Sequence, residues 1–373
     1  MARSYRLFSL FVAIAVIGMQ VGTANAEDRP RPAATKVFID TDSGVDDIFA
    51  IAYLLKERSI NVLGFTTVNG NTTVSNATNN LLTLFDVIGT TKPVTIGAAA
   101  PLQLPASRVG QLIHGPSGIW FSQTQHNLAA LPTDAPAAIA AAARANPGMT
   151  LLTLGPLTNV AQAVQRFPQD LVGVKIVALA GARGPGNRTP VAETNVFIDP
   201  QASEIVFGSG LNLTMITLDA FKQVTVDSAE FTQELTNDGG QLGQFLASIF
   251  GPYSNALTQG QGGLVGLPDV AAAVYVVQPS VGTPTSGLVR IVTNTDYTRG
   301  QTIIAIEPNA KIGLVTDDAQ LSGLADQVFT TPNFNLFFAL AVFFAQNPDN
   351  AQVVLDVYER PLLRLFERRL LEH

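Results

Sequence analysis

Four aspartates lie within eight positions of the chain, directly after an apolar segment. Residues 36–39 read as a buried strand, and Asp40, Asp42, Asp46 and Asp47 follow it, the last two opening a run with apolar residues at helical spacing. Like charges repel, and a helix N-terminus contributes only about 0.3–1 kcal/mol per group, too little to neutralise four carboxylates. Hard divalent cations prefer oxygen ligands. The sequence therefore predicts a metal site between a strand and a helix.

Strands and helices must position these carboxylates. In the sequence, apolar runs that read as strands alternate with amphipathic segments that read as helices. Such alternation is typical of an α/β fold with a mostly parallel central sheet flanked by helices, a Rossmann-like architecture. The predicted strands are residues 36–39, 62–67, 94–96, 150–154, 175–180 and 213–217. The predicted helices are residues 46–57, 74–88, 136–145, 157–167 and 200–208. In such sheets ligands bind beyond the carboxyl ends of the strands.

The loops that follow these predicted strands are polar. Asn71 follows the second strand, and the motif from Gly155 to Asn159 follows the fourth, where Thr158 and Asn159 are better read as helix caps than as site residues. A long loop after the fifth strand carries Asn187, Glu193 and Asn195. Two amides and a carboxylate opposite an acidic site indicate hydroxyl binding.

Two further features could belong to a site. Residues 101–132 form a long irregular segment with His114, Trp120 and His126, which reads either as a lid or as a surface loop anchored by its tryptophan. Asp269 stands at the head of an apolar helix, where it is either a metal ligand or an N-cap.

The N-terminus predicts export. Arg3 and Arg6 precede an apolar run over residues 7–21, followed by Ala24-Asn25-Ala26, which is typical of a signal peptide cleaved after residue 26 and of a periplasmic or secreted protein. No stable membrane span is expected after cleavage. The chain has no cysteine, so disulfides and thiolate ligands are excluded, and its net charge of −7 argues against nucleic acid as a partner.

The rest of the chain reads as one domain over residues 27–346 with a helical extension over residues 347–373. Residues 334–346 are too short for a membrane span and predict a buried helix. Residues 358–373 are amphipathic and locally basic, which favours a surface helix; docking on a neighbouring subunit of a homo-oligomer, or on a membrane surface, is the alternative.

Four motifs together resemble the calcium-dependent nucleoside hydrolases, in the order and spacing of that family. They are Asp40-Thr-Asp-Ser-Gly-Val-Asp-Asp47, Thr66-Thr-Val-Asn-Gly-Asn71, Leu154-Gly-Pro-Leu-Thr-Asn159 and Pro190-Val-Ala-Glu-Thr-Asn-Val-Phe-Ile-Asp-Pro200. The resemblance covers about residues 36–346. It implies hydrolysis of the N-glycosidic bond of a ribonucleoside to free base and ribose, through a Ca²⁺-bound water.

The resemblance also implies roles for individual residues. Asp42 would be the general base. The Ca²⁺ ligands would be Asp42, Asp47, the Leu154 carbonyl and Asp269. The ribose would be held by Asp46 at the 2′-hydroxyl, Asn195 and Asp269 at the 3′-hydroxyl, and Asn187 and Glu193 at the 5′-hydroxyl, with Asn71 lining the pocket. Asp40 would orient Asp42 or its neighbours from behind.

One position departs from the pattern. Many members that act on inosine and uridine have a histidine before the late aspartate, where it protonates the leaving base, and this chain has Pro268. The candidates for activating the base are then His114, Trp120, His126 and Tyr253. The departure also leaves an alternative, a non-catalytic nucleoside- or pentose-binding protein on the same scaffold. Purine or pyrimidine preference is not predicted.

Overall fold

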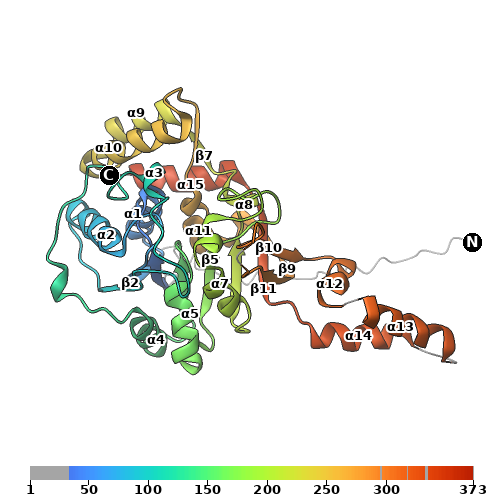
Figure 1. Ribbon diagram of the computed structural model, residues 1–373. Coiled ribbons are helices and arrows are strands. Elements are labelled where there is room, and N and C mark those ends of the chain that lie inside the picture. Colours follow the sequence, from blue (N-terminus) through green and yellow to red (C-terminus); the bar gives the residue numbers. More distant parts are fainter. Residues whose placement is uncertain (1–32, 295, 317, 332–334, 373) are drawn as a thin grey trace, which may run out of the picture. The chain divides into compact units, whose positions relative to one another are not determined.

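Nine strands form the central sheet, in the order β10-β9-β11-β6-β5-β4-β1-β2-β3 (Figure 1). They are β1 (Thr35–Thr41), β2 (Ile60–Thr67), β3 (Val94–Ile96), β4 (Thr150–Thr153), β5 (Lys175–Leu179), β6 (Asn212–Ile216), β9 (Gly282–Ile291), β10 (Thr302–Ala305) and β11 (Ala351–Val357), while β7 (Thr225–Asp227) and β8 (Leu264–Gly266) form a separate pair. Neighbouring strands from β11 to β3 are parallel, and β9 runs antiparallel to β10 and β11. The predicted α/β class is confirmed.

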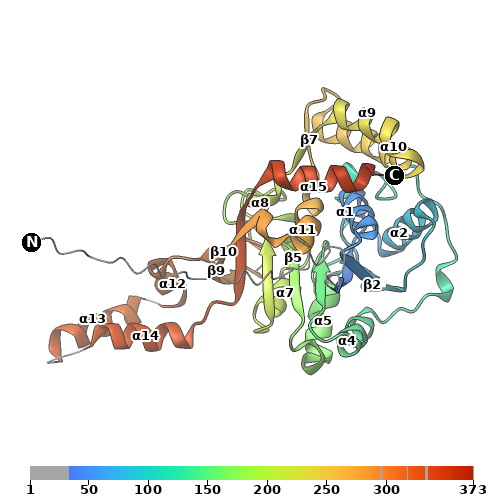
Figure 2. The ribbon, with the colours of Figure 1, turned by 180° about the vertical axis from the view of Figure 1, so that it is seen from behind.

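Helices cover both faces of this sheet (Figures 1 and 2). The α-helices of the described residues are α1 (Val45–Lys56), α2 (Val74–Ile88), α3 (Gln111–His114), α4 (Ala135–Ala145), α5 (Thr158–Arg166), α6 (Thr194–Ile198), α7 (Pro200–Phe207), α8 (Leu218–Phe221), α9 (Ser228–Asp238), α10 (Gly240–Thr258), α11 (Pro268–Val277), α12 (Pro308–Val315), α13 (Asp318–Thr330), α14 (Leu336–Gln346) and α15 (Glu359–Leu371), of which α13 and α14 extend away from the sheet. On β1, Val37 and Ile39 face the cluster formed with α1, α2, α8–α11 and α15, and Phe38 faces α4, α5 and α7. Both faces are buried, which explains the continuous apolar strands.

The computed structural model describes residues 33–294, 296–316, 318–331 and 335–372. The predicted signal peptide lies outside these residues. Within them, none of the helices has the length and apolar character needed to cross a membrane. The six predicted strands and five predicted helices are found with ends within two residues of the predicted ones.

The C-terminal boundary of the domain was predicted wrongly. Residues 351–357 form β11, which lies inside the central sheet between β6 and β9, so 347–373 is not a helical extension. The helix that follows, α15, is also no simple surface helix. Its residues Leu362, Phe366 and Leu370 are buried, and Phe366 contacts the rings of Phe49 and Tyr53 on α1. The sequence showed that this segment is amphipathic, but it could not identify what the apolar face packs against.

The helix predicted over residues 334–346 is present as α14, but it is not buried. Phe337 is 86% exposed and Phe338 is 68% exposed. Apolar composition alone does not place a helix in the core, because burial also needs a neighbouring face to cover it.

Candidate functional site

The acidic turn joins β1 to α1 in a strained conformation. Ser43 has a φ of 43°, in the left-handed region that L-residues seldom adopt. Asp47 fixes the turn, because its Oδ1 accepts from the Thr41 hydroxyl at 2.5 Å and its Oδ2 accepts from the Gly44 amide at 3.0 Å. A Cβ on Gly44 would lie 2.5 Å from Nδ2 of Asn71, so only glycine fits beside the polar residues that meet here.

Asn71 ties the turn to the loop after β2. Its backbone amide donates to Oδ2 of Asp42 at 2.6 Å, and its side-chain amide donates at 3.2 Å to both Asp42 Oδ1 and Asp47 Oδ2. Asp42 and Asp47 are buried. The side-chain amide of Asn71 bonds to both carboxylates and fixes their relative positions.

Gly70 makes the close approach of this loop to Asp42 possible. A Cβ at Gly70 would lie 1.9 Å from Asp42 Oδ2, so Gly70→Ala must displace either the carboxylate or the loop. If Asp42 is the general base that the resemblance implies, we expect this variant to lower kcat about 10–100-fold, the range in which a misplaced catalytic group costs activity. Gly251→Ala is the matched control, because a Cβ there meets no atom within 4 Å. Equal activity of the two variants would contradict the placement of Asp42.

Asp40 lies behind the turn and does not line the cavity. Its Oδ1 accepts from the Thr66 hydroxyl at 2.5 Å and from the side-chain amide of Asn159 at 2.7 Å, while its Oδ2 has no partner. Burial raises the pKa of Asp40 to about 7. The prediction that Asn159 caps a helix was wrong, because its side chain bridges Asp40 to the backbone carbonyl of Thr67.

Three carboxylates converge on one point. Asp46, Asp47 and Asp269 each offer an oxygen, and these oxygens lie within 4.8 Å of one another. All three side chains are buried, and Asp269 Oδ1 has no hydrogen-bond partner. Burial, followed by the charges of Asp46 and Asp47, raises the pKa of Asp269 well above its ordinary value. Burial and then the charge of Asp47 do the same for the pKa of Asp42. Without a cation these groups cannot all be ionised at neutral pH.

This electrostatic conflict predicts an unusual pH dependence of stability for the metal-free protein. Burial raises the pKa of Asp40 to about 7 and that of Asp46 to about 6. A carboxyl whose pKa is raised by folding stabilises the protein below its unfolded pKa, and that contribution is lost as the pH rises through the folded pKa. We therefore expect the free energy of unfolding to fall by a few kcal/mol between about pH 4 and pH 7.

The measurement is the thermal midpoint in chelator at pH 5 and pH 8. The midpoint is expected to be several degrees lower at pH 8, and saturating Ca²⁺ is expected to reduce the difference. A metal-free midpoint that rises between pH 5 and pH 8 would show that these carboxyls are not protonated in the folded protein.

A cavity of about 450 Å³ opens beside this cluster, at the carboxyl ends of the parallel strands. It brings together nine residues that the sequence singled out: Asp46, Asn71, His114, Leu154, Asn187, Glu193, Asn195, Tyr253 and Asp269. Asp42 and Asp47 stand behind the lining, where Asn71 contacts both. The volume falls within the range of small-molecule sites.

The loop after β5 supplies one wall of the cavity. Glu193 caps α6, and its carboxylate accepts from the amides of Gly181, Asn195 and Val196 at 2.9–3.2 Å. The side-chain amide of Asn195 donates to the carbonyl of Leu154 at 2.7 Å, which fixes that oxygen at the cavity wall. Asn187 accepts from the amide of Thr194 at 3.0 Å.

His114 and Tyr253 lie together in the lining of the cavity. Nδ1 of His114 accepts from the amide of Val45 at 3.1 Å, so the ring carries its proton on Nε2. Burial lowers the pKa of His114 to about 4. The ring centroids of His114 and Tyr253 are 5.4 Å apart, and the Tyr253 hydroxyl donates to the carbonyl of Gly266 at 3.0 Å.

The other two aromatic candidates do not line the cavity. Nε2 of His126 lies 2.9 Å from Oδ2 of Asp86 at the far end of the irregular segment. Trp120 has a φ of 58° and packs on the edge of the core, where its carbonyl accepts from the Ser117 hydroxyl. Of the candidates for the leaving base, the structure thus brings only His114 and Tyr253 to the cavity.

Several cavity residues were not identified from the sequence. Val109, Leu112 and Leu257 are exposed side chains at the cavity, and Arg188 is its one lysine or arginine among the described residues. Single aliphatic residues in loops carry no pattern that sets them apart. Arg188 lies in the loop after β5, whose residues Asn187, Glu193 and Asn195 were predicted to bind hydroxyls.

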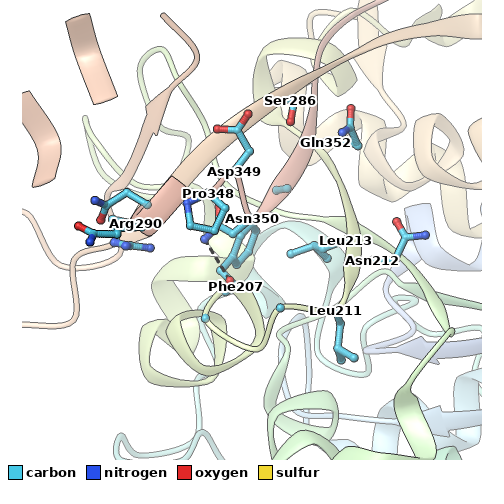
Figure 3. A pocket seen from close by; sticks show the side chains of 15 residues that line it. Phe207, Leu211, Asn212, Leu213, Ser286, Arg290, Pro348, Asp349, Asn350 and Gln352 are labelled. Carbon is cyan, nitrogen blue, oxygen red and sulfur yellow. Dashed lines mark hydrogen bonds between the residues drawn. The ribbon is translucent and has the colours of Figure 1, made fainter. Parts of the chain in front are cut away.

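A second cavity, of about 340 Å³, lies at the amino ends of β6 and β11, on the opposite edge of the sheet (Figure 3). Its charged lining residues are Arg290 and Asp349, and Asp349 forms an ion pair with Lys311. Asn350 spans its wall with a hydrogen bond to the carbonyl of Phe207. With one carboxylate, already paired, this cavity lacks the ligands for a metal site.

The fold and the first cavity define an α/β protein with an acidic candidate metal site beside a polar, ligand-sized pocket. The profile of the inosine-uridine preferring nucleoside hydrolase family matches residues 37–360. The non-specific ribonucleoside hydrolase RihC of Salmonella paratyphi C (strain RKS4594) is 34% identical over 295 residues, which cover 76% of this chain and 94% of RihC. The chain therefore belongs to the nucleoside hydrolase family and is an enzyme of the N-ribosyl hydrolase class.

Solved structures show the same fold. A plant nucleoside hydrolase has a TM-score of 0.75 at 25% identity, with 91% of this chain and 99% of that chain covered. A purine-preferring ribonucleoside hydrolase from Gardnerella vaginalis has a TM-score of 0.71 at 25% identity, with 90% and 98% covered. The family profile extends to residue 360, which agrees with the position of β11 inside the sheet.

Proposed function

We propose that this enzyme hydrolyses the N-glycosidic bond of ribonucleosides with a metal-bound water, releasing free base and ribose. The observation that carries the proposal is the convergence of Asp46, Asp47 and Asp269 beside a cavity that Asn187 and Asn195 also line. A metal ion held by the clustered carboxylates would activate a water. The amides and carboxylates that line the cavity would bind and orient the hydroxyls of a ribose.

The residues present fit Ca²⁺. Asp42, Asp47, Asp269 and the Leu154 carbonyl would hold it, and the unpartnered Asp269 Oδ1 is the oxygen best explained by a bound cation. The donors are all oxygens, as Ca²⁺ prefers, and the Leu154 carbonyl keeps a lone pair beside its bond from Asn195. When bound, the ion supplies positive charge to the buried carboxylates and lowers the pKa of a coordinated water.

Asp42 is proposed as the general base, since Asn71 fixes both of its oxygens beside Asp47. Asp46 is proposed to accept from the ribose 2′-hydroxyl. The 3′-hydroxyl is assigned to Asn195 and Asp269, and the 5′-hydroxyl to Asn187 and Glu193. Holding the sugar in this way favours the oxocarbenium-like transition state of glycoside cleavage.

For the leaving base we propose His114 as a neutral hydrogen-bond donor. Its Nδ1 is occupied by the Val45 amide, which leaves the Nε2 proton for a ligand. Its lowered pKa means that it is neutral at physiological pH, so it can stabilise the base by donating a hydrogen bond rather than by carrying a positive charge. Tyr253 would support the histidine ring, because its own hydroxyl proton is already donated. A kcat for inosine that is unchanged in His114→Ala would contradict this assignment.

The rival that Pro268 suggested from the sequence, a non-catalytic nucleoside- or pentose-binding protein, is disfavoured by the chain's membership of a hydrolase family. A reducing-sugar assay with inosine, adenosine, uridine and cytidine separates the two functions. The proposal requires ribose from at least one nucleoside with multiple turnovers. Tight binding of a nucleoside without release of ribose would favour the rival.

We also propose that the chain is exported, on the basis of Arg3, Arg6 and the apolar run before Ala26. Expression of the full chain in a bacterial host, followed by N-terminal sequencing of the protein outside the cytoplasm, tests the proposal. The expected first residue is Glu27. An intact Met1 on the cytoplasmic protein would contradict it.

A further inference from the structure

An unpaired cation lies beside the cavity. Arg188 lines the cavity next to Asn187 and close in sequence to Glu193, the two residues assigned above to the 5′ end of the ribose. Among the described residues Arg188 has no carboxylate within ion-pair distance, and its guanidinium lies over the ring of Phe197 at 5.3 Å. The positive charge of Arg188 is therefore available to a ligand.

A second guanidinium lies on the same ring. Arg299 lies 3.7 Å from the centroid of Phe197 and donates to the Phe197 carbonyl at 3.0 Å. Burial, and then the charge of Arg188, lower the pKa of Arg299. Two like charges that share one aromatic ring without a carboxylate partner in the described chain form a site that favours an anion.

The backbone holds Arg188 in place. Its amide donates to the carbonyl of Ala192 at 3.0 Å, and Ala192 forms an antiparallel bridge with Gln301, two residues after Arg299. Gly186 packs so closely on Ala192 that a Cβ would lie 2.2 Å from the Ala192 carbonyl oxygen. The backbone of the loop is thus tied to the segment that carries the second cation.

The nearby carboxylate does not oppose an anion strongly. Glu193 accepts three backbone amide bonds, which compensate its charge, and burial raises its pKa. The cavity of about 450 Å³ also has room beyond a ribose and its base, because ligand sites of about 300–1,000 Å³ accommodate drug-sized molecules.

We propose that this enzyme also hydrolyses ribonucleoside 5′-monophosphates, with Arg188 as the residue that binds the 5′-phosphate. The proposal rests on the function proposed above and extends its substrate class. In the reaction the C1′–N bond breaks, water supplies the hydroxyl at C1′ and a proton to the base, and the products are the free base and ribose 5-phosphate. The phosphate ester remains intact. Arginine suits this role because its planar donors match phosphate oxygens.

The test compares inosine and uridine with their 5′-monophosphates, and mass spectrometry distinguishes ribose from ribose 5-phosphate. The variants are Arg188→Gln and, as a matched control in the same loop, Arg183→Gln, whose arginine pairs with Glu307 and does not line the cavity. In Arg188→Gln the ratio of kcat/KM for the monophosphate to that for the nucleoside is expected to fall at least about tenfold, the effect of losing a hydrogen bond to a charged group. In Arg183→Gln the ratio is expected to stay at the wild-type value.

Two results would overturn the proposal. One is a wild-type enzyme that releases ribose from nucleosides but no ribose 5-phosphate from the monophosphates. The other is a ratio that Arg188→Gln leaves unchanged. Failure of the function proposed above would look different, because then no sugar would be released from the nucleosides either, and both proposals would fall.

Discussion

Asp42→Asn is expected to lower kcat for ribonucleoside hydrolysis about 10²–10⁴-fold, the range that general-base catalysis contributes. An asparagine keeps an oxygen for the metal and nearly the same shape, but it cannot take a proton from water. Both oxygens of Asp42 accept hydrogen bonds from Asn71, and the amide nitrogen of an asparagine cannot accept one, so ligand binding must be measured beside kcat. Steady-state kinetics with inosine would give kcat and KM separately.

The control for this variant is binding. Asp42→Asn should still bind Ca²⁺ and a non-hydrolysable ribose mimic in calorimetry, because Asp47, Asp269 and the ribose contacts remain. A kcat within a factor of about two of the wild type would show that another group acts as base, since base removal should cost at least a hundredfold.

Asp46→Asn is expected to remove most of the preference for ribose over 2′-deoxyribose. A buried group that is built to pair with a substrate hydroxyl rejects the analogue that lacks it, by up to about 10⁴-fold. Asp46 is buried, lines the cavity and has an oxygen near those of Asp47 and Asp269. We therefore expect the wild type to cleave inosine at least about 10³-fold better than 2′-deoxyinosine in kcat/KM, and the variant to show less than a tenth of that preference.

The ratio separates a lost hydroxyl contact from general damage, because damage would lower activity toward both substrates equally. A preference that is unchanged in Asp46→Asn would place the 2′-hydroxyl elsewhere. Asn71→Ala is a useful comparison, since Asn71 lines the same cavity but bonds to Asp42 and Asp47. It should reduce activity without changing the sugar preference.

Much of the fold could be predicted because the parallel strands are buried on both faces and read as continuous apolar runs. The edge that includes β9, β10 and β11 could not be predicted so well. β9 contains Gly282, Pro284 and Gly287, which weaken the strand signal, and four of its successive residues from Thr283 to Ser286 are exposed. The apolar face of α15 was visible in the sequence, but its partners on α1 lie some 300 positions earlier. Such a long-range contact leaves no local pattern.

In the candidate site, too, some residues could be predicted from local sequence patterns and others could not. Most of the carboxylates and amides were found because polar residues directly after buried strands stand out, and six carboxylate and amide residues meet at the cavity. Trp120 and His126 were candidates because they are rare residue types in a long loop. The loop turns them away from the cavity, and side-chain direction in an irregular segment depends on contacts such as that of His126 with Asp86. The role proposed for Arg188 could not be predicted from the sequence, because it depends on the position of Arg188 relative to Phe197 and Arg299.

The central claim is that buried carboxylates and a bound divalent ion together activate water for cleavage of a ribonucleoside. Its most direct test is the rate of ribose release from inosine by the purified enzyme after chelation and then after titration with Ca²⁺. We predict that chelation abolishes ribose release and that Ca²⁺ restores it, because Asp42, Asp47 and Asp269 are too close to be ionised together without a cation. Full activity in a verified metal-free enzyme would contradict the claim.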